Sequence, residues 1–378
     1  MDRSKWEYKK LGDICKSINA GGTPSRGNSA YWNGDIPWVK IKDMNSKYVN
    51  STEEFITNEG LNNSSAKLFE PGTILYSIFA TIGAASILKI PATTNQAIAG
   101  IVLGDGCNRD FYYYYLTSLK THFENISKGV AQNNINLSVL RNQKVVVPPI
   151  EDQQRIVAEL DCLNEMIAVK QEQLKEFDKL AQSIFYDMFG DDGGFDKVKL
   201  GDVVEVVSGL VNPNIEPYCS QLHVSPANIV SGTNEIVNCV KAKDERLISD
   251  KYPFEAGMVL YSKIRPNLNK VAVATFDGIC SADMYPLAIL PKANNVFITK
   301  LLSSKQFLEY AIKNSGRARM PKLNRDTLFS YSFKLPPLAL QQQFAEKISA
   351  IEAQKELVKQ SIAETQTLLS YTMDKYFG

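Results

Sequence analysis

The sequence FEPGTILYS at residues 69–77 returns, slightly altered, as FEAGMVLYS at residues 254–262. Other motifs recur around it in the same order: Leu-Gly-Asp at 11–13 and 200–202, Pro-Pro at 148–149 and 336–337, Gln-Gln at 153–154 and 341–342, and Phe-Gly at 189–190 and 377–378. Solenoid repeats have periods of about 20–50 residues, so copies roughly 185–189 residues apart indicate a duplicated domain. The sequence therefore predicts two similar globules in one chain.

The bulk composition agrees with two globular domains. The chain has 378 residues, of which 44% are hydrophobic and 22% are charged, values typical of soluble proteins. No apolar run reaches the roughly 18–20 residues of a membrane span, and the N-terminus lacks the apolar core of a signal peptide. The six cysteines are scattered, without a Cys-x-x-Cys pair. We therefore expect a cytoplasmic protein with reduced thiols and no metal site.

The charge balance limits how this chain could bind nucleic acid. Its 42 Lys and Arg residues against 41 Asp and Glu residues give a net charge of +1. A protein that binds nucleic acid alone is often strongly basic. Any basic footprint is therefore local, or the chain works inside a larger complex.

Residues 150–190 and 338–378 have the pattern of long helices. Apolar residues recur at alternating steps of three and four, which is typical of a coiled-coil seam. The first seam comprises Ile156, Leu160, Leu163, Ile167, Leu174 and Phe177. The second comprises Phe344, Ile348, Ile351, Val358, Ile362 and Leu369. A Pro-Pro pair just before each helix stops the preceding strand.

Two arrangements of these helices are compatible with the pattern. They could be surface helices, each packed on its own globule. The narrowness and length of both seams favour pairing instead. If the helices pair, they run antiparallel, because the first leads from globule one to globule two and the second leaves globule two.

Residues 1–149 and 191–337 have the mixed pattern of α+β globules. In the first, β-rich runs lie at 36–41, 73–79, 97–103 and 144–147, and a helix is expected near 109–118. In the second, the runs lie at 221–225, 258–264, 285–290 and 331–335, and a helix is expected near 298–313. The predicted fold class is α+β, with two pseudo-symmetric globules separated by a long antiparallel two-helix coiled coil.

The two copies differ most in two polar loops, one after the Tyr-Ser pair and one before the last strand. These loops carry side chains that reach base edges and phosphates. The candidate contacts are Thr81, Gln132, Asn133 and Asn134 in copy one, and Lys263, Arg265, Asn267, Arg317, Arg319 and Lys322 in copy two. Different loops on one framework could read two different DNA half-sites. The alternative for the basic loop is a solvated surface strip.

Further candidates lie earlier in each copy. The loop GGTPSR at 21–26 offers Thr23, Ser25 and Arg26, and the strand that follows offers Lys40 and Lys42. His223 lies on the matching strand of copy two, although a lone histidine is more often structural. The loop could equally be only a turn. The aromatic run FYYYYL at 111–116 resembles a base-stacking platform, but its place on a predicted helix favours core packing.

No catalytic constellation is visible in the sequence. It has no G-x-x-x-x-G-K-[ST] loop, no G-x-S-x-G elbow and no H-E-x-x-H pair. The Pro-Pro pairs lack the Asn/Asp and aromatic flanks that amino-methyltransferases use to hold a target amine. We therefore expect no covalent chemistry on this chain.

Several motifs together resemble the specificity subunit of type I restriction–modification systems, over essentially the full chain. They are WEYKKLGD at 6–13, GGTPS at 21–25, DIPWV at 35–39, PPIEDQQRI at 148–156, GRARMPKLN at 316–324 and LPPL at 335–338. Copy two lacks the Thr-Pro-Ser loop and the Trp-Val pair. Its first recognition loop is therefore expected to be built differently.

The resemblance implies a specific division of labour. Residues 1–149 and 191–337 would be target recognition domains, each reading half of a bipartite site in double-stranded DNA, and the helices at 150–190 and 338–378 would set the spacer. Two modification subunits would bring S-adenosylmethionine and methylate adenine N6. Restriction subunits would add ATP- and Mg²⁺-dependent cleavage, while this chain would carry no cofactor. The alternative is a coiled-coil interaction protein whose globules bind protein or peptide partners.

Overall fold

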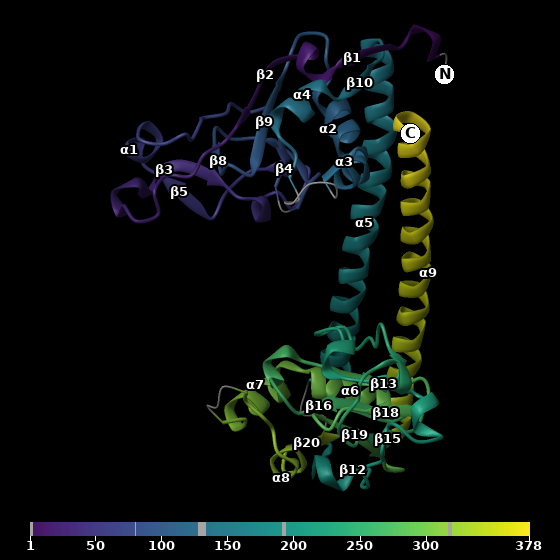
Figure 1. Ribbon diagram of the computed structural model, residues 1–378. Helices are drawn as coiled ribbons and strands as arrows, with labels where there is room; N and C mark the ends of the chain where they lie inside the picture. The colour runs from purple at the N-terminus through teal and green to yellow at the C-terminus, as the bar shows by residue number, and fades with distance from the viewer. Residues whose placement is uncertain (1–2, 80, 128–133, 191–193, 317–319) are drawn as a thin grey trace. The chain divides into compact units, whose positions relative to one another are not determined.

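The computed structural model describes residues 3–79, 81–127, 134–190, 194–316 and 320–378. The chain divides into two compact units (Figure 1). Unit 1 comprises residues 1–169 and 362–378, and unit 2 comprises residues 170–361. The division cuts both long helices, α5 (Ile150–Phe189) and α9 (Leu338–Phe377). Each unit therefore contains one globule and a segment of each long helix.

The globule of unit 1 consists of short strands and helices. Its strands are β1 (Glu7–Lys10), β2 (Cys15–Ala20), β3 (Trp32–Val39), β4 (Tyr48–Val49), β5 (Glu54–Ile56), β6 (Ile74–Ser77), β7 (Ala85–Leu88), β8 (Thr93–Thr94), β9 (Ile98–Leu103) and β10 (Lys144–Val147). Its α-helices are α1 (Asn58–Asn62), α2 (Arg109–Ser118), α3 (Lys120–Ser127) and α4 (Leu137–Asn142). The main sheet has the order β2-β9-β6-β7-β4, beside the sheets β5-β3-β8 and β1-β10.

The globule of unit 2 follows the same plan. Its strands are β11 (Asp196–Lys199), β12 (Val204–Val206), β13 (Leu222–Val224), β14 (Val240–Lys241), β15 (Tyr252–Phe254), β16 (Val259–Ser262), β17 (Val271–Val273), β18 (Gly278–Cys280), β19 (Met284–Ile289) and β20 (Ser332–Leu335). Its α-helices are α6 (Asn295–Ser303), α7 (Lys305–Asn314) and α8 (Arg325–Phe329). The sheets have the orders β12-β19-β16-β17, β14-β13-β18-β15 and β11-β20.

Short 3-10 helices connect these elements. They are η1 (Arg3–Lys5), η2 (Leu11–Ile14), η3 (Ser29–Tyr31) and η4 (Ile41–Asp43) in unit 1, and η5 (Leu200–Asp202), η6 (Tyr218–Ser220), η7 (Pro226–Asn228), η8 (Ala242–Asp244) and η9 (Pro266–Leu268) in unit 2. The turn Leu-Gly-Asp, one of the repeated motifs, forms η2 and η5.

The shared strand order confirms the predicted duplication. The run β2-β9-β6-β7 corresponds to β12-β19-β16-β17, and the parallel pair β3–β8 corresponds to β13–β18. The repeated motif forms the turn into β6 and into β16, where Gly72 and Gly257 have φ angles of 94° and 91°. Residues with a Cβ rarely adopt this left-handed backbone, so the turn needs glycine in both copies.

Helix α2 supplies the centre of the unit 1 core. Phe111, Tyr112 and Leu116 are fully buried, in one cluster with residues of the main sheet. The Asn108 side chain caps the helix by accepting a hydrogen bond from the Phe111 amide at 3.1 Å. The aromatic run is therefore core, as the sequence favoured.

The corresponding region of unit 2 departs from the prediction. The sequence indicated one helix near 298–313, whereas the structure has two, α6 and α7. Ser304 separates them because its backbone is extended, with φ −67° and ψ 152°. Its hydroxyl then caps α7 by accepting a hydrogen bond from the Phe307 amide at 3.3 Å.

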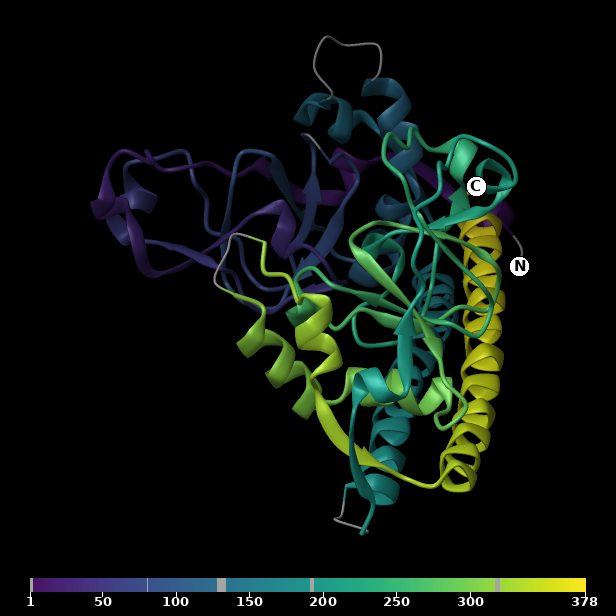
Figure 2. The ribbon, with the colours of Figure 1, turned by 90° about the horizontal axis from the view of Figure 1, so that it is seen from below.

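Within each unit, α9 runs antiparallel to α5 (Figures 1 and 2). In unit 1 the Tyr376 hydroxyl, near the end of α9, donates to Glu159 near the start of α5 at 2.5 Å. In unit 2 the rings of Phe185 and Phe344 lie 5.7 Å apart, which joins the end of α5 to the start of α9. The seam residues are buried or half-buried: Ile156, Leu160, Leu163, Ile167, Leu174, Phe177, Phe344, Ile348, Ile351, Val358, Ile362 and Leu369.

The seam also packs on the globules. Ile156 and Leu160 belong to the core cluster of unit 1, and Ile348 and Ile351 belong to that of unit 2. The two arrangements considered from the sequence are thus combined, because the same apolar face serves helix pairing and globule packing.

A buried glutamine joins α5 to the globule of unit 1. The Gln153 Oε1 atom accepts a hydrogen bond from the Asn108 amide at 2.7 Å, and its Nε2 atom donates to the Pro148 carbonyl at 2.8 Å. A longer bond of 3.4 Å reaches the Gly106 carbonyl. Gln153 therefore links the first turn of α5 to the residue that caps α2.

In unit 2, Gln341 makes the same kind of link between α9 and the globule, and we call each of these links a joint. Its Oε1 atom accepts from the Asn294 amide at 2.9 Å, and its Nε2 atom donates to the Pro336 carbonyl at 2.8 Å. Both glutamines are fully buried, whereas their neighbours Gln154 and Gln342 are exposed. Only the first glutamine of each repeated pair holds its helix.

Replacing Gln153 by leucine should lower the free energy of unfolding of unit 1 by about 2–4 kcal/mol, because buried backbone groups lose their partners. The same change at exposed Gln154 is the matched control and should cost less than about 0.5 kcal/mol. Chemical denaturation of both variants measures the difference. Equal losses would show that the Gln153 bonds do not hold the joint.

A lysine occupies the helix seam of unit 2. The Lys355 side chain is 2% exposed, and its Nζ lies 2.9 Å from Asp178 Oδ1, 3.2 Å from Glu352 Oε2 and 3.6 Å from Glu235 Oε1. Burial lowers the pKa of Lys355, but Asp178 and Glu352 outweigh burial and raise it overall. Asp178 lies on α5 and Glu235 lies in the globule, so this cluster ties both to α9.

Replacing Lys355 by alanine should destabilise unit 2 by about 2–4 kcal/mol, because loss of the buried lysine side chain leaves a cavity and Asp178 and Glu352 lose an ion-pair partner. Lys359, which pairs with Glu235 at 2.9 Å but is 37% exposed, is the control. Its replacement by alanine should cost about 0–1 kcal/mol. Thermal unfolding of the two variants tests the ranking, and the reverse order would refute it.

Candidate nucleic-acid interface

Two loops that differ strongly between the copies lie side by side in unit 2. The Leu323 amide donates to the Lys263 carbonyl at 2.8 Å, and Ile264 pairs with Lys322 across an antiparallel bridge. The structure thus brings together residues that are far apart in sequence. The exposed candidates on these loops are Arg265, Asn267 and Lys322.

The corresponding loops of unit 1 are paired in the same way. The Ile135 amide donates to the Ile78 carbonyl at 3.0 Å, and Phe79 pairs with Asn134 across an antiparallel bridge. Thr81 is exposed and Asn134 is half-buried. The candidates that lie outside the described residues are Gln132, Asn133, Arg317 and Arg319.

The serine of the repeated Tyr-Ser pair organises the first loop in both units. Ser77 Oγ accepts a hydrogen bond from the Ala84 amide at 2.8 Å, and Ser262 Oγ donates to the Ile264 carbonyl at 3.1 Å. Both serines are buried. The loops therefore start from the same anchor even though their side chains differ.

Lys263 is largely buried beneath the unit 2 loops. It is 7% exposed, and its Nζ lies 4.9 Å from the centre of the Tyr285 ring, in a cation–π contact. Burial lowers the pKa of Lys263, and the positive charge of Lys322 lowers it further. The two ammonium groups repel each other, and an anion bound near both would relieve this repulsion.

Arg26 of unit 1 stacks on two tryptophans. Its guanidinium carbon lies 3.7 Å from the centre of the Trp32 ring and 4.9 Å from that of Trp38. Its Nη1 atom lies 2.6 Å from Glu54 Oε2. The guanidinium is held in one orientation, although the side chain remains 55% exposed.

Carboxylates balance the basic candidates of unit 1. Lys40 pairs with Glu54, and Lys42 pairs with Glu53. Hydrogen bonding to Lys40 lowers the pKa of Glu54, and hydrogen bonding to Lys42 lowers that of Glu53. Both acids therefore stay ionised at neutral pH. A phosphate bound here would have to displace them.

The glycines at the start of the 21–26 loop permit close backbone packing. A Cβ atom on Gly22 would lie 2.3 Å from Ser65 Oγ, and the Trp38 indole donates to the Gly22 carbonyl at 2.9 Å. The Thr23 hydroxyl is tied to Gln96, whereas the Ser25 side chain is exposed. Ser25 and Arg26 are thus the more accessible candidates of this loop.

Unit 2 builds this region differently, as the missing Thr-Pro-Ser motif predicts. Val211 and Lys251 exchange backbone hydrogen bonds of 2.8 and 2.9 Å. His223 is 4% exposed, and its Nδ1 lies 2.6 Å from Glu245 Oε2. Burial lowers the pKa of His223, and Glu245 offsets part of this effect. His223 lies below the surface in the geometry of a structural residue.

The acidic partners of Arg26 and Lys40 were not predicted from the sequence. Glu54 stands directly opposite Trp38 in the antiparallel pairing of β3 and β5. This register depends on how the two strands pair. The only sequence signal is the acidic pair Glu53-Glu54 just ahead of an apolar residue, and it does not identify the partners.

The described ranges show no disulfide, metal cluster or membrane-spanning helix. All six cysteines are free thiols. Across those ranges, no three His, Cys, Asp or Glu residues gather in a metal-holding cluster. Every helix described there is too short or too polar to pass through a lipid bilayer.

Comparison with known proteins gives a consistent family. The family model for the type I restriction modification DNA specificity domain matches residues 3–177 and 193–366. The chain is 30% identical to the type I restriction enzyme MjaIX specificity subunit of Methanocaldococcus jannaschii over 274 residues, which are 64% of this chain and 63% of that protein. It is 35% identical to the EcoR124I/EcoR124II specificity subunit of Escherichia coli over 162 residues, 41% of this chain and 40% of that protein.

The chain therefore spans less than two thirds of the length of these relatives. A solved chain from a study of complex assembly and conformational transition in the type I R-M system matches with a TM-score of 0.63 and 18% identity. This match covers 99% of the present chain and 98% of the solved one. The likeness is one of fold.

Replacing Glu54 by glutamine should strengthen the attraction of unit 1 for polyanions, because Arg26 and Lys40 lose a shared counter-ion. The variant should elute from heparin at higher salt than the unmodified chain. Glu59→Gln removes the same charge from an exposed position on α1 and should shift elution less. Equal shifts would mean that Arg26 and Lys40 do not face the polyanion.

Proposed function

Because the chain belongs to the type I restriction-modification DNA specificity family, we propose that it gives a type I restriction–modification complex its DNA sequence specificity. One observation carries the proposal. The two units share a strand order and pair the same two loops, yet the loops present different side chains. Two domains with the same fold but different loop side chains can each recognise a different half of a DNA site.

In this proposal, residues 1–149 and 191–337 are the target recognition domains, and each reads one half of a bipartite site. The helical segments 150–190 and 338–378 set the unread spacer between the halves. The joints at Gln153 and Gln341 support this assignment, because each fixes a globule to the helix that leaves it.

Different side chains serve the two half-sites. In unit 2 the exposed Arg265, Asn267 and Lys322 contact the DNA, with Arg317 and Arg319 as further candidates, and the buried Lys263 contributes its charge from beneath the loops. In unit 1 they are Thr81 and Asn134, with Gln132 and Asn133 as further candidates and Thr23, Ser25, Arg26, Lys40 and Lys42 on a second surface. Arginine and lysine suit guanine edges and asparagine suits adenine, while several of these cations would contact phosphates.

The chemistry in this proposal belongs to partner subunits. Modification subunits bring S-adenosylmethionine and methylate adenine N6, and restriction subunits bring ATP and Mg²⁺. This chain contributes recognition and a scaffold, without a catalytic group, and acts on DNA in the cytoplasm. The net charge of +1 supports shared neutralisation of phosphates by the partners.

Mapping of methylated adenines in DNA from cells that carry the complex tests the proposal directly. The expected result is one asymmetric motif of two short parts with an unread gap. A continuous palindrome would contradict it.

Single loop variants should affect one half-site only. Arg265→Ala or Lys322→Ala should weaken binding by about 1–3 kcal/mol where the side chain reads a base, and should relax specificity in one half of the motif. Lys197→Ala, on exposed β11, is the matched control. Binding to duplexes altered in either half separates the outcomes, and equal losses for both halves would disprove the assignment.

A further inference from the structure

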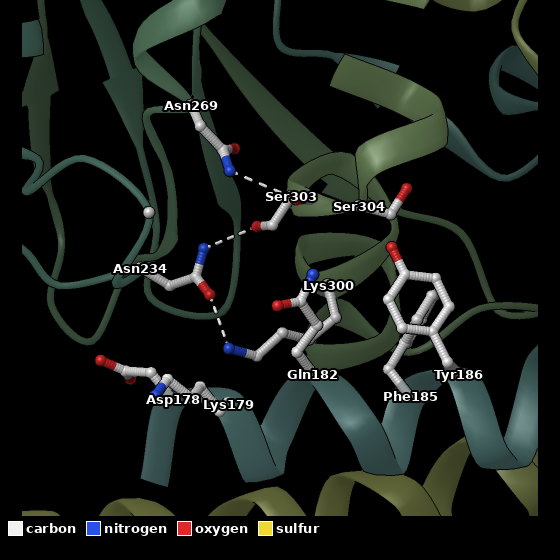
Figure 3. A pocket seen from close by; sticks show the side chains of 11 residues that line it. Asp178, Lys179, Gln182, Phe185, Tyr186, Asn234, Asn269, Lys300, Ser303 and Ser304 are labelled. Carbon is white, nitrogen blue, oxygen red and sulfur yellow. Dashed lines mark hydrogen bonds between the residues drawn. The ribbon is translucent and has the colours of Figure 1, made fainter. Parts of the chain in front are cut away.

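A small polar pocket lies within unit 2 (Figure 3). Its volume is about 180 Å³. Gln182 and Tyr186 of α5 form one wall, and Lys300 of α6 stands opposite with Asn234 and Asn269 from two loops. The pocket therefore lies between the long helix and the globule of this unit, and Asn269 belongs to the same loop as Arg265 and Asn267.

Lys300 is a cation without a carboxylate partner in the described structure. Its Nζ donates to Asn234 Oδ1 at 2.7 Å, and no Asp or Glu in the described ranges lies within 4 Å of it. Asp178 also lines the pocket, but Lys355 holds this carboxylate at 2.9 Å. Burial lowers the pKa of Lys300, and the more distant carboxylates of Glu352 and Asp178 offset only part of this effect. A buried ammonium group is costly unless something compensates its charge.

Asn269 leaves a second polar atom unsatisfied. Its Oδ1 is buried and has no hydrogen-bond partner among the described residues. Its Nδ2 donates to the Ser303 carbonyl at 3.2 Å. Asn234 Nδ2 donates to Ser303 Oγ at 2.8 Å, so a hydrogen-bonded chain connects Asn269 to Lys300. The pocket thus offers a positive donor and a free acceptor in one network.

The loops around the pocket have left-handed backbone at three positions. Asn234 and Asn269 have φ angles of 63° and 47°, in the left-handed region that residues with a Cβ seldom occupy. Gly232, at φ 77°, also lines the pocket. Asn and Gly adopt this conformation more readily than other residues, so both loops can turn sharply beside the pocket.

The fold itself does not require a lysine at this position. Counting from the matching caps Asn108 and Asn294, Tyr114 of α2 takes the place of Lys300 of α6. The Tyr114 hydroxyl donates to Asp161 of α5, so unit 1 has a satisfied neutral group there. A lysine at this helix position is particular to unit 2, whereas the cation near Tyr114 in unit 1 is Lys47, which pairs with Asp161 at 2.6 Å.

We propose that this pocket binds free inorganic phosphate or a small phosphate monoester in its singly protonated form. The charged oxygens accept hydrogen bonds from Lys300, and the P–OH group donates to Asn269 Oδ1. A DNA phosphodiester has no such proton and does not satisfy Asn269. The proposal rests on the pocket residues and does not depend on DNA reading.

The test uses inorganic phosphate and thermal unfolding of the full chain at constant ionic strength near pH 7. At ten times the dissociation constant, phosphate should raise the midpoint for unit 2 by about 3–6 °C. Lys300→Met should lose this rise without lowering the midpoint in the absence of phosphate, because it removes a desolvated charge. Lys347→Met, on the exposed face of α9, is the control and should keep the rise.

Sulfate provides a second arm, because it has the same shape but carries no proton near pH 7. It should stabilise the chain less than phosphate. Equal responses to both anions, no rise with phosphate, or the same rise in Lys300→Met would overturn the proposal. One further result would also overturn it: phosphate has no effect, and Lys300→Met reduces by about one the slope of log binding constant against log salt for DNA. Lys300 would then contact a DNA phosphate.

Discussion

The orientation of each globule depends on one buried amide that must satisfy several backbone groups at once. Gln153 bonds the carbonyl that precedes α5 and the amide of the residue that caps α2, and Gln341 does the same in unit 2. Because both glutamines are excluded from water, no solvent molecule can replace a lost bond. A globule cannot turn on its helix without breaking this joint, so the positions of its loops follow from the first turn of the helix.

The helix pair adds a constraint through charge. A purely apolar seam tolerates sliding by one heptad, because every layer looks alike. Lys355 removes that freedom in unit 2, since its ammonium must meet Asp178 on α5 and Glu235 in the globule together. A shifted register would bury the lysine without partners, at a cost of several kcal/mol. The main effect of the Lys355 charge is therefore to select one register of α9 against α5, and its contribution to the stability of unit 2 is secondary.

Sequence patterns predicted the features that depend on residues close together in the chain. The duplicated motifs predicted two similar globules, and the long-helix pattern at residues 150–190 closely contains helix α5 at Ile150–Phe189. Contacts that depend on strand pairing, such as the ion pairs of Glu54, were not predicted. Neither strand alone determines the register in which β3 pairs with β5. The break between α6 and α7 at Ser304 was not predicted. Ser304 can cap α7 only because its backbone is extended, and the sequence does not show that conformation. The pocket at Lys300 needs four separate segments and has no sequence signature.

The way the paired loops are held explains how two copies of one fold can carry different readers. Where the structure describes both loops, backbone hydrogen bonds join them in each unit, from the Ile135 amide to the Ile78 carbonyl and from the Leu323 amide to the Lys263 carbonyl. Any residue other than proline can supply such a donor, and every residue supplies the acceptor. The exposed loop side chains can therefore change at little cost to stability. Buried glutamines, serines and turn glycines have no such freedom, which is why they are the features that recur.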